Sequence, residues 1–186
     1  MADAVSRITR TPIRILDLAR TARDLKDKGY TATSDSVIDG GVYYPDKNEI
    51  RVIQRNPSML DLSRVIAHED THAALSQAGM MGERMPEGIP ALMTMKRILT
   101  GAGPGNLPDK LRRSFLESDY AGVSDEEIPA QAVSYGRGDL PGVTKRDLDD
   151  WFEVFSSGLP GPVSDKLKQI RRAAAAAEQF WGKYER

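Results

Sequence analysis

The chain of 186 residues has the length of one ordinary domain, and it carries 26 Lys and Arg against 27 Asp and Glu, a formal net charge of −1. This balance gives no electrostatic reason to expect a polyanionic partner, so nucleic-acid binding is disfavoured as the direct function. The chain has no cysteine, which excludes disulfides and thiolate metal sites and leaves histidine, carboxylate and water as metal ligands.

The sequence also gives no sign of a membrane or secretory segment. Its first stretch, MADAVSRITRTPIRIL, lacks the apolar core of a secretory signal. No run of about 18 consecutive apolar residues, the length that spans a bilayer, occurs in the chain. We therefore expect a soluble, cytoplasmic protein with no membrane partner.

The first half of the chain predicts one helix and then a hairpin. Thr11 and Pro12 are typical of a helix start, and Gly29 of a helix end. Between them apolar residues recur at helical spacing: Ile15, Leu18, Ala19, Ala22 and Leu25. Next, the runs Val42–Tyr44 and Glu49–Ile53 alternate in the manner of strands and are joined by the turn-forming sequence PDKN.

The remainder of the chain reads as helices. Ser58, with Asp61 three residues later, predicts the start of a helix that extends to about Gln77. Further helices are expected at 89–99, 107–116, from about 124, from about 144 and at about 164–181. The predicted fold class is α+β and mainly helical, with a small β-hairpin or sheet before the helix that starts at Ser58. We expect one domain over residues 1–186, with a core at about 30–140 and a C-terminal helical extension at about 144–186.

The motif HEDTH contains both histidines of the chain, His68 and His72. Residues four apart lie on one face of a helix, so the two imidazoles can bind one metal ion. Glu69 is rotated about 100° from His68, which places its carboxylate beside the ion, where it can take a proton from bound water. Glu69 also continues the apolar stripe of the helix, so its side chain should point inward. That stripe consists of Leu62, Val65, Ile66 and Ala73.

A catalytic zinc normally has three protein ligands and one position for water. A third histidine is impossible here because the chain has only two. The metzincin continuation of the motif also fails, since Leu75 stands in the place of its glycine and Ala78 in the place of its histidine. The third ligand must therefore be a carboxylate.

The sequences GGVYYPDKNEIRVI and VIAHEDTHAALSQAG resemble the hairpin and active-site helix of minimal gluzincins, which are compact zinc metallopeptidases. The most similar group is the zincin-like domains within large polyvalent proteins of phages and mobile elements. The resemblance implies a zincin-like fold and a third ligand from a glutamate on a later helix, followed three residues on by alanine and often preceded by a tyrosine. Tyr120, Glu127 and Ala130 match that pattern, and the small Ala130 would let this helix approach the active-site helix closely.

The alternative third ligand is Glu87 in RMPEGIPALM, which lies 87 − 72 = 15 residues beyond His72. There the alanine falls one position late, with Pro90 in its expected place. Glu126 and Asp119 are further carboxylates to compare with Glu127.

The sequence thus predicts a zinc metallopeptidase that acts on a protein or peptide, with Zn2+ as cofactor and Glu69 as general base. The strand Glu49–Ile53 is expected to pair with the extended substrate, and Tyr120 or Tyr135 is a candidate oxyanion partner. The alternative is a catalytically inactive zincin-fold binding or structural protein, such as a phage or mobile-element accessory factor. A phage-encoded protein of this kind could be associated with the virion.

Overall fold

A computed structural model describes residues 7–17, 40–54, 58–80, 127–134 and 142–184. This part of the chain is mainly helical with one small sheet, which confirms the predicted α+β class. The predicted helices at 89–99 and 107–116 lie outside the described residues. In chain order the described elements are β1 (Ile13–Asp17), β2 (Gly40–Tyr44), β3 (Glu49–Gln54), α3 (Met59–Gln77), α6 (Glu127–Ser134), α7 (Lys145–Ser157) and α8 (Gly161–Trp181).

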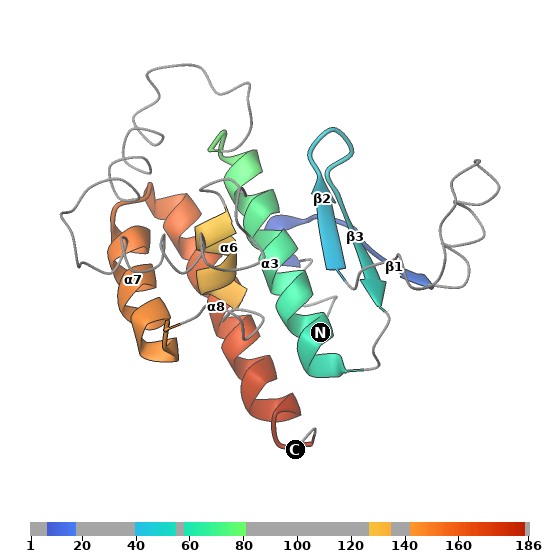
Figure 1. Cartoon of the computed structure of the whole chain (residues 1–186). Helices are drawn as coiled ribbons and strands as arrows, with labels where there is room; N and C mark the ends of the chain where they lie inside the picture. Colours follow the sequence, from blue (N-terminus) through green and yellow to red (C-terminus); the bar gives the residue numbers. More distant parts are fainter. Residues whose placement is uncertain (1–6, 18–39, 55–57, 81–126, 135–141, 185–186) are drawn as a thin grey trace.

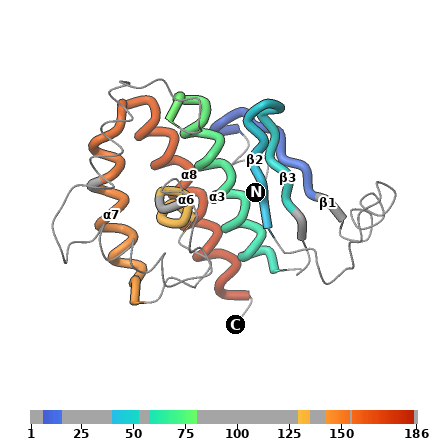
Figure 2. The backbone as a smooth tube through the Cα atoms, turned by 45° about the horizontal axis from the view of Figure 1, so that its top comes forward, coloured from blue at the N-terminus to red at the C-terminus, as the bar shows by residue number. Residues whose placement is uncertain are grey.

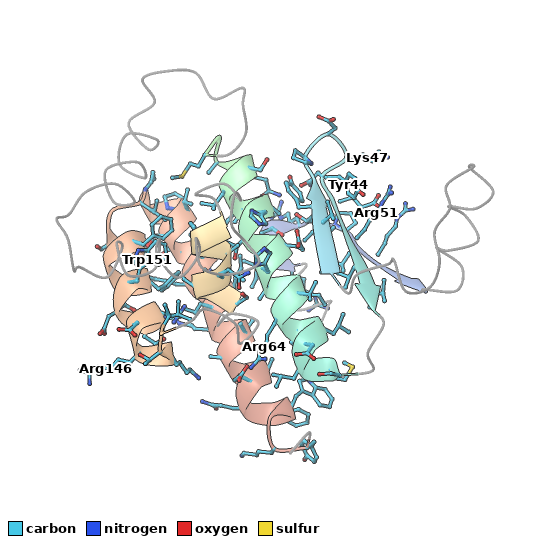
Figure 3. All side chains as sticks on the ribbon, viewed as in Figure 1. Tyr44, Lys47, Arg51, Arg64, Arg146 and Trp151 are labelled. Carbon is cyan, nitrogen blue, oxygen red and sulfur yellow. The ribbon has the colours of Figure 1, made fainter. Side chains whose placement is uncertain are left out.

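The three strands form a sheet in the order β1-β3-β2. The predicted hairpin is confirmed: β2 pairs with β3 antiparallel, Tyr44 opposite Glu49, across a turn in which Asn48 adopts a left-handed φ of 46°. On the outer face, the Arg51 guanidinium lies 4.7 Å from the centre of the Tyr44 ring (Figure 3), and Arg51 Nε donates to Glu49 Oε1 over 2.7 Å. The hydrogen bond from Arg51 lowers the pKa of Glu49 below its ordinary value. The contact of Arg51 with the Tyr44 ring joins β3 to β2, whereas its hydrogen bond to Glu49 lies within β3.

The predicted helix starting at Thr11 and Pro12 is wrong over its first residues. Ile13–Asp17 is the strand β1, parallel to β3, with Ile13 opposite Ile50. The backbone N–H of Ile50 donates to the carbonyl of Pro12 over 2.9 Å. Pairing with a distant strand therefore overrides the local helix-start signal, since the β-branched residues of this segment suit a sheet. The rest of that predicted helix, to Gly29, is outside the described residues.

Helix α3 is the central element of the fold. Figures 1 and 2 show the sheet on one side of it and α6, α7 and α8 on the other. One apolar cluster packs α3 against the sheet through Ile50, Val52 and Ile66. A second, larger cluster packs α3 against the three other helices and is centred on Trp151, Phe155 and Leu167. Because α3 is covered on both sides, most of its residues are buried, including polar ones.

The helix starts agree closely with the sequence signals. The Ser58 side chain accepts a hydrogen bond from the backbone N–H of Asp61 and caps α3. Thr144 and Asp147 form a complete capping box at the start of α7. The last helix, α8, ends at Trp181 as predicted but begins at Gly161, three residues earlier than expected, because Pro162 suits the first turn of a helix.

Two arginines join α8 to its neighbours. Arg64 of α3 donates to both carboxylate oxygens of Glu178, over 3.1 and 2.8 Å (Figure 3). Arg171, which is buried, donates to the carbonyl of Ala132 in α6 and to the carboxylate of Asp149 in α7. Through these contacts α8 fixes α3, α6 and α7 relative to one another.

No helix in the described part of the chain is long and apolar enough to cross a membrane.

Candidate metal centre

The two histidines of α3 converge as the motif predicts. His68 Nε2 and His72 Nε2 lie 3.2 Å apart, with their ring centres separated by 4.9 Å and their planes at 72°. Two nitrogen ligands of a tetrahedral zinc, each about 2.0–2.1 Å from the ion, are about 3.3 Å apart. The spacing of the imidazoles therefore fits two adjacent ligand positions of one zinc ion.

The same distance also fits an N–H···N hydrogen bond between two neutral imidazoles. The two arrangements differ in what lies around the pair. A zinc site needs a carboxylate nearby as third ligand and, for hydrolysis, a second carboxylate as general base. Carboxylates close to the two imidazoles therefore distinguish a zinc site from a simple hydrogen-bonded pair of histidines.

Glu69 supplies one such carboxylate and is held in place by β2. Its side chain is only 6% exposed, as expected from its position on the apolar stripe of α3. Glu69 Oε2 accepts a hydrogen bond of 2.9 Å from the backbone N–H of Tyr43. A Cβ atom at Gly41 would lie 2.4 Å from Glu69 Cγ, so only glycine lets β2 approach this closely. The strand thus contributes a fixed donor to the candidate base.

The position of β2 corrects one expectation about substrate binding. The strand Glu49–Ile53, predicted to pair with a peptide, lies within β3, which has β1 on one side and β2 on the other. Both of its edges are therefore occupied. In the described sheet, β2 is the antiparallel edge strand beside Glu69, and its outer edge is paired with no other strand.

The third ligand is not settled by the described side chains. No group of three His, Asp, Glu or Cys residues that could hold a metal is found among them. Glu127 is the first residue of α6, but its side chain is not described. The other carboxylates and tyrosines considered for the site lie outside the described residues: Glu87, Asp119, Glu126, Tyr120 and Tyr135.

The backbone of α6 is described, and it packs against the helix that carries both histidines. Helix α6 packs on α3 and is enclosed by α3, α7 and α8, as Figure 2 shows in a view nearly along its axis. Ala130, one turn after Glu127, is fully buried. The expectation that this small residue lets α6 lie close to the helix that carries both histidines stays a prediction.

Asp70, next to Glu69, is a buried acid that sequence reasoning did not single out. It is 0% exposed and accepts a hydrogen bond from the hydroxyl of Thr9. Burial raises its pKa to about 7, against the lowering effects of Thr9 and Lys166. Ile66 and Ala67 lie one turn before Asp70 and are apolar. This pattern in the sequence could have indicated that the face of α3 that carries Asp70 is buried.

Comparisons of the chain with protein-family models, with curated proteins and with solved structures found no match.

Proposed function

We propose that the chain is a zinc-dependent metallopeptidase. The observation that supports this best is the 3.2 Å approach of His68 Nε2 and His72 Nε2 on the helix that also carries the buried Glu69. His68, His72 and Glu127 would hold the ion, with Glu87 as the alternative third ligand. A zincin-like fold is part of the proposal.

When bound, zinc supplies Lewis acidity, which lowers the pKa of a water molecule towards neutrality and polarises a carbonyl group. Glu69 would accept the proton of that water as its oxygen attacks the peptide carbonyl, and would then pass the proton to the leaving amine. The reaction consumes one water and yields a carboxylate and an amine. The hydrogen bond from the Tyr43 N–H orients the Glu69 carboxylate towards β2.

The edge of β2 favours an extended peptide as the substrate. A peptide can add to a sheet edge through backbone hydrogen bonds, with its side chains alternating between the two faces. At β2 it would lie directly beside Glu69, and it would bond to backbone groups of that edge other than the Tyr43 N–H, which donates to Glu69. A protein or peptide substrate therefore suits this site better than a small molecule does.

Metal content tests the proposal first. Mass spectrometry of untagged protein should find about one zinc per chain, lost in His72→Ala and reduced in one of two variants, Glu127→Ala or Glu87→Ala. The variant that loses zinc identifies the third ligand. If the wild type takes up no zinc after reconstitution, the metallopeptidase proposal fails.

Peptide hydrolysis is the second test. Glu69→Gln should retain zinc but lose about 10²–10⁴-fold of the rate of cleavage of a peptide library, since the general base is gone. Glu153→Gln, on the exposed surface of α7, is the matched control and should cleave as the wild type does. Wild-type protein that holds zinc without cleaving any peptide would favour the alternative, an inactive zincin-fold binding or structural protein.

A further inference from the structure

The sheet has an outer face, on the side away from α3, that combines charged and exposed apolar side chains. Side chains alternate along a strand, so the residues that alternate with the buried Ile50 and Val52 of β3 point to this face, as do their partners on β1 and β2. The outer face consists of Arg14, Val42, Tyr44, Glu49 and Arg51. Figure 3 shows Tyr44 and Arg51 on the side of the sheet opposite α3.

The outer face carries two arginines and one carboxylate. Arg14 and Arg51 lie opposite each other on neighbouring strands, where like charges repel. Both contact Glu49, whose Oε1 atom lies 2.7 Å from Arg51 Nε and 3.4 Å from Arg14 Nε. The exposed Asp46 and Lys47 of the adjoining turn balance each other in charge. One positive charge therefore remains in excess, and the Arg14 side chain is 67% exposed to solvent.

Apolar surface lies next to these charges on β2. Val42 is 50% exposed and Tyr44 is 36% exposed, and the two residues are neighbours on the same face of the strand. The Arg51 guanidinium lies 4.7 Å from the centre of the Tyr44 ring. Arginine and aromatic residues are enriched in protein interfaces, where they supply much of the binding energy. The outer face thus has the composition of a protein-binding surface.

The same side chains favour a protein segment over a nucleic acid as the partner. A nucleic acid would stack a base on the Tyr44 ring and place its phosphates on several cations. Two cations already lie over that ring, since Lys47 Nζ is 5.9 Å and the Arg51 guanidinium 4.7 Å from its centre. A single excess charge is also small for a polyanion. The exposed Val42, in contrast, suits an aliphatic side chain of a protein.

We propose that the outer face of the sheet is a docking surface for an acidic segment of a partner protein. A carboxylate of the partner pairs with Arg14 and Arg51, and an apolar side chain beside it covers Val42 and Tyr44. This face is separate from the free edge of β2, where the proposed substrate would add. Docking on the outer face therefore requires neither zinc nor Glu69 and goes beyond the proposed function.

The test measures the binding of a fluorescein-labelled peptide, in which glutamate and valine alternate, to the metal-free protein by fluorescence anisotropy. The wild type should bind this peptide, and more weakly as the salt concentration rises. Arg14→Glu should weaken binding about 10–100-fold, because an attraction becomes a repulsion. Arg146→Glu is the matched control, since Arg146 is 90% exposed on α7 and lies 3.8 Å from Asp150 (Figure 3). It gives the same net charge and should leave Kd unchanged.

A second pair of measurements tests the apolar part of the surface. Val42→Thr removes apolar contact while keeping a residue that suits a strand, so it should weaken binding several-fold without changing the midpoint of urea unfolding. A peptide with glutamine in place of glutamate should bind the wild type more weakly, and Arg14→Glu should then have little effect. Together these results would show that both the carboxylate and the apolar side chain of the partner contribute.

Four results would overturn the inference. Absence of binding between the wild type and the glutamate–valine peptide would mean that the face holds no acidic segment. Equal losses in Arg14→Glu and Arg146→Glu would mean that the peptide responds only to net charge. Tighter binding of a single-stranded oligothymidylate, lost in Arg14→Glu, would assign the face to nucleic acid. A wild-type dimer in sedimentation that Arg14→Glu dissociates would make it an interface between two copies of the chain. Failure of the proposed function is distinct from all four, because this binding is measured without zinc.

Discussion

Gly41 and Glu69 approach each other so closely that no side chain fits between them. A Cβ atom at Gly41 would lie 2.4 Å from Cγ and 2.9 Å from Oε1 of Glu69, and 2.8 Å from Cγ1 of Val65. This approach lets the strand β2 reach the buried carboxylate and bond it through the N–H of Tyr43. The strand and the candidate base are consequently parts of one rigid arrangement.

The first prediction concerns Gly41→Ala. The added methyl group must displace either β2 or the Glu69 side chain, and overpacking of this kind costs about 1–3 kcal/mol. Peptide hydrolysis should fall further than zinc affinity does, because the displaced side chain is the base and not a ligand. Urea unfolding, zinc titration and peptide cleavage measure the three effects.

Gly161→Ala is the matched control, since a Cβ there meets nothing within 4 Å at the start of α8. It should leave stability unchanged or raise it slightly. Equal stability of the two alanine variants would show that β2 does not lie on Glu69 as described.

The second prediction concerns Arg171, whose guanidinium binds the Ala132 carbonyl and the Asp149 carboxylate and lies 4.7 Å from the centre of the Phe152 ring. Arg171→Met should lower the free energy of unfolding by about 2–4 kcal/mol, because a buried carbonyl loses its donor and an ion pair is broken. Arg171→Lys should recover part of this loss through a single donor.

The neighbouring Arg172→Met is the control, because Arg172 is exposed on the same helix. Its stability should stay within about 0.5 kcal/mol of the wild type, as is usual for surface substitutions. If Arg171→Met is as stable as Arg172→Met in urea, Arg171 does not hold α6 in place.

Much of the site helix and its surroundings could be predicted from the sequence because the signals are local. The Ser58 cap, the hairpin before α3 and the Thr144 capping box each depend on residues a few positions apart. The inward position of Glu69 followed from helical periodicity, and its 6% exposure confirms it.

The features that could not be predicted depend on contacts distant in the sequence. The strand β1 forms because Ile13 pairs with Ile50, which the Thr11–Pro12 signal does not disclose. The close approach of Gly41 to Glu69 and the burial of Asp70 under Thr9 arise only when the sheet and the N-terminal segment pack on α3. The choice between Glu127 and Glu87 as third ligand stays a prediction.

The third prediction concerns the pH dependence of stability and rests on Asp70. Its pKa is raised from 3.8 to about 7 because burial disfavours the charged form, so the folded protein holds this proton more tightly than the unfolded chain does. The stabilising effect of the proton is complete at low pH, and it is lost as the pH rises from about 4 to about 7. For a pKa raised from 3.8 to about 7, the loss is roughly 4 kcal/mol. In Asp70→Asn the group is neutral at every pH, so the variant should gain stability relative to the wild type between pH 5 and pH 8.

Urea unfolding of the metal-free proteins measures this difference, and the exposed Asp150→Asn should show none. A difference between Asp70→Asn and wild type that stays constant from pH 5 to pH 8 would mean that Asp70 is ionised in the folded protein.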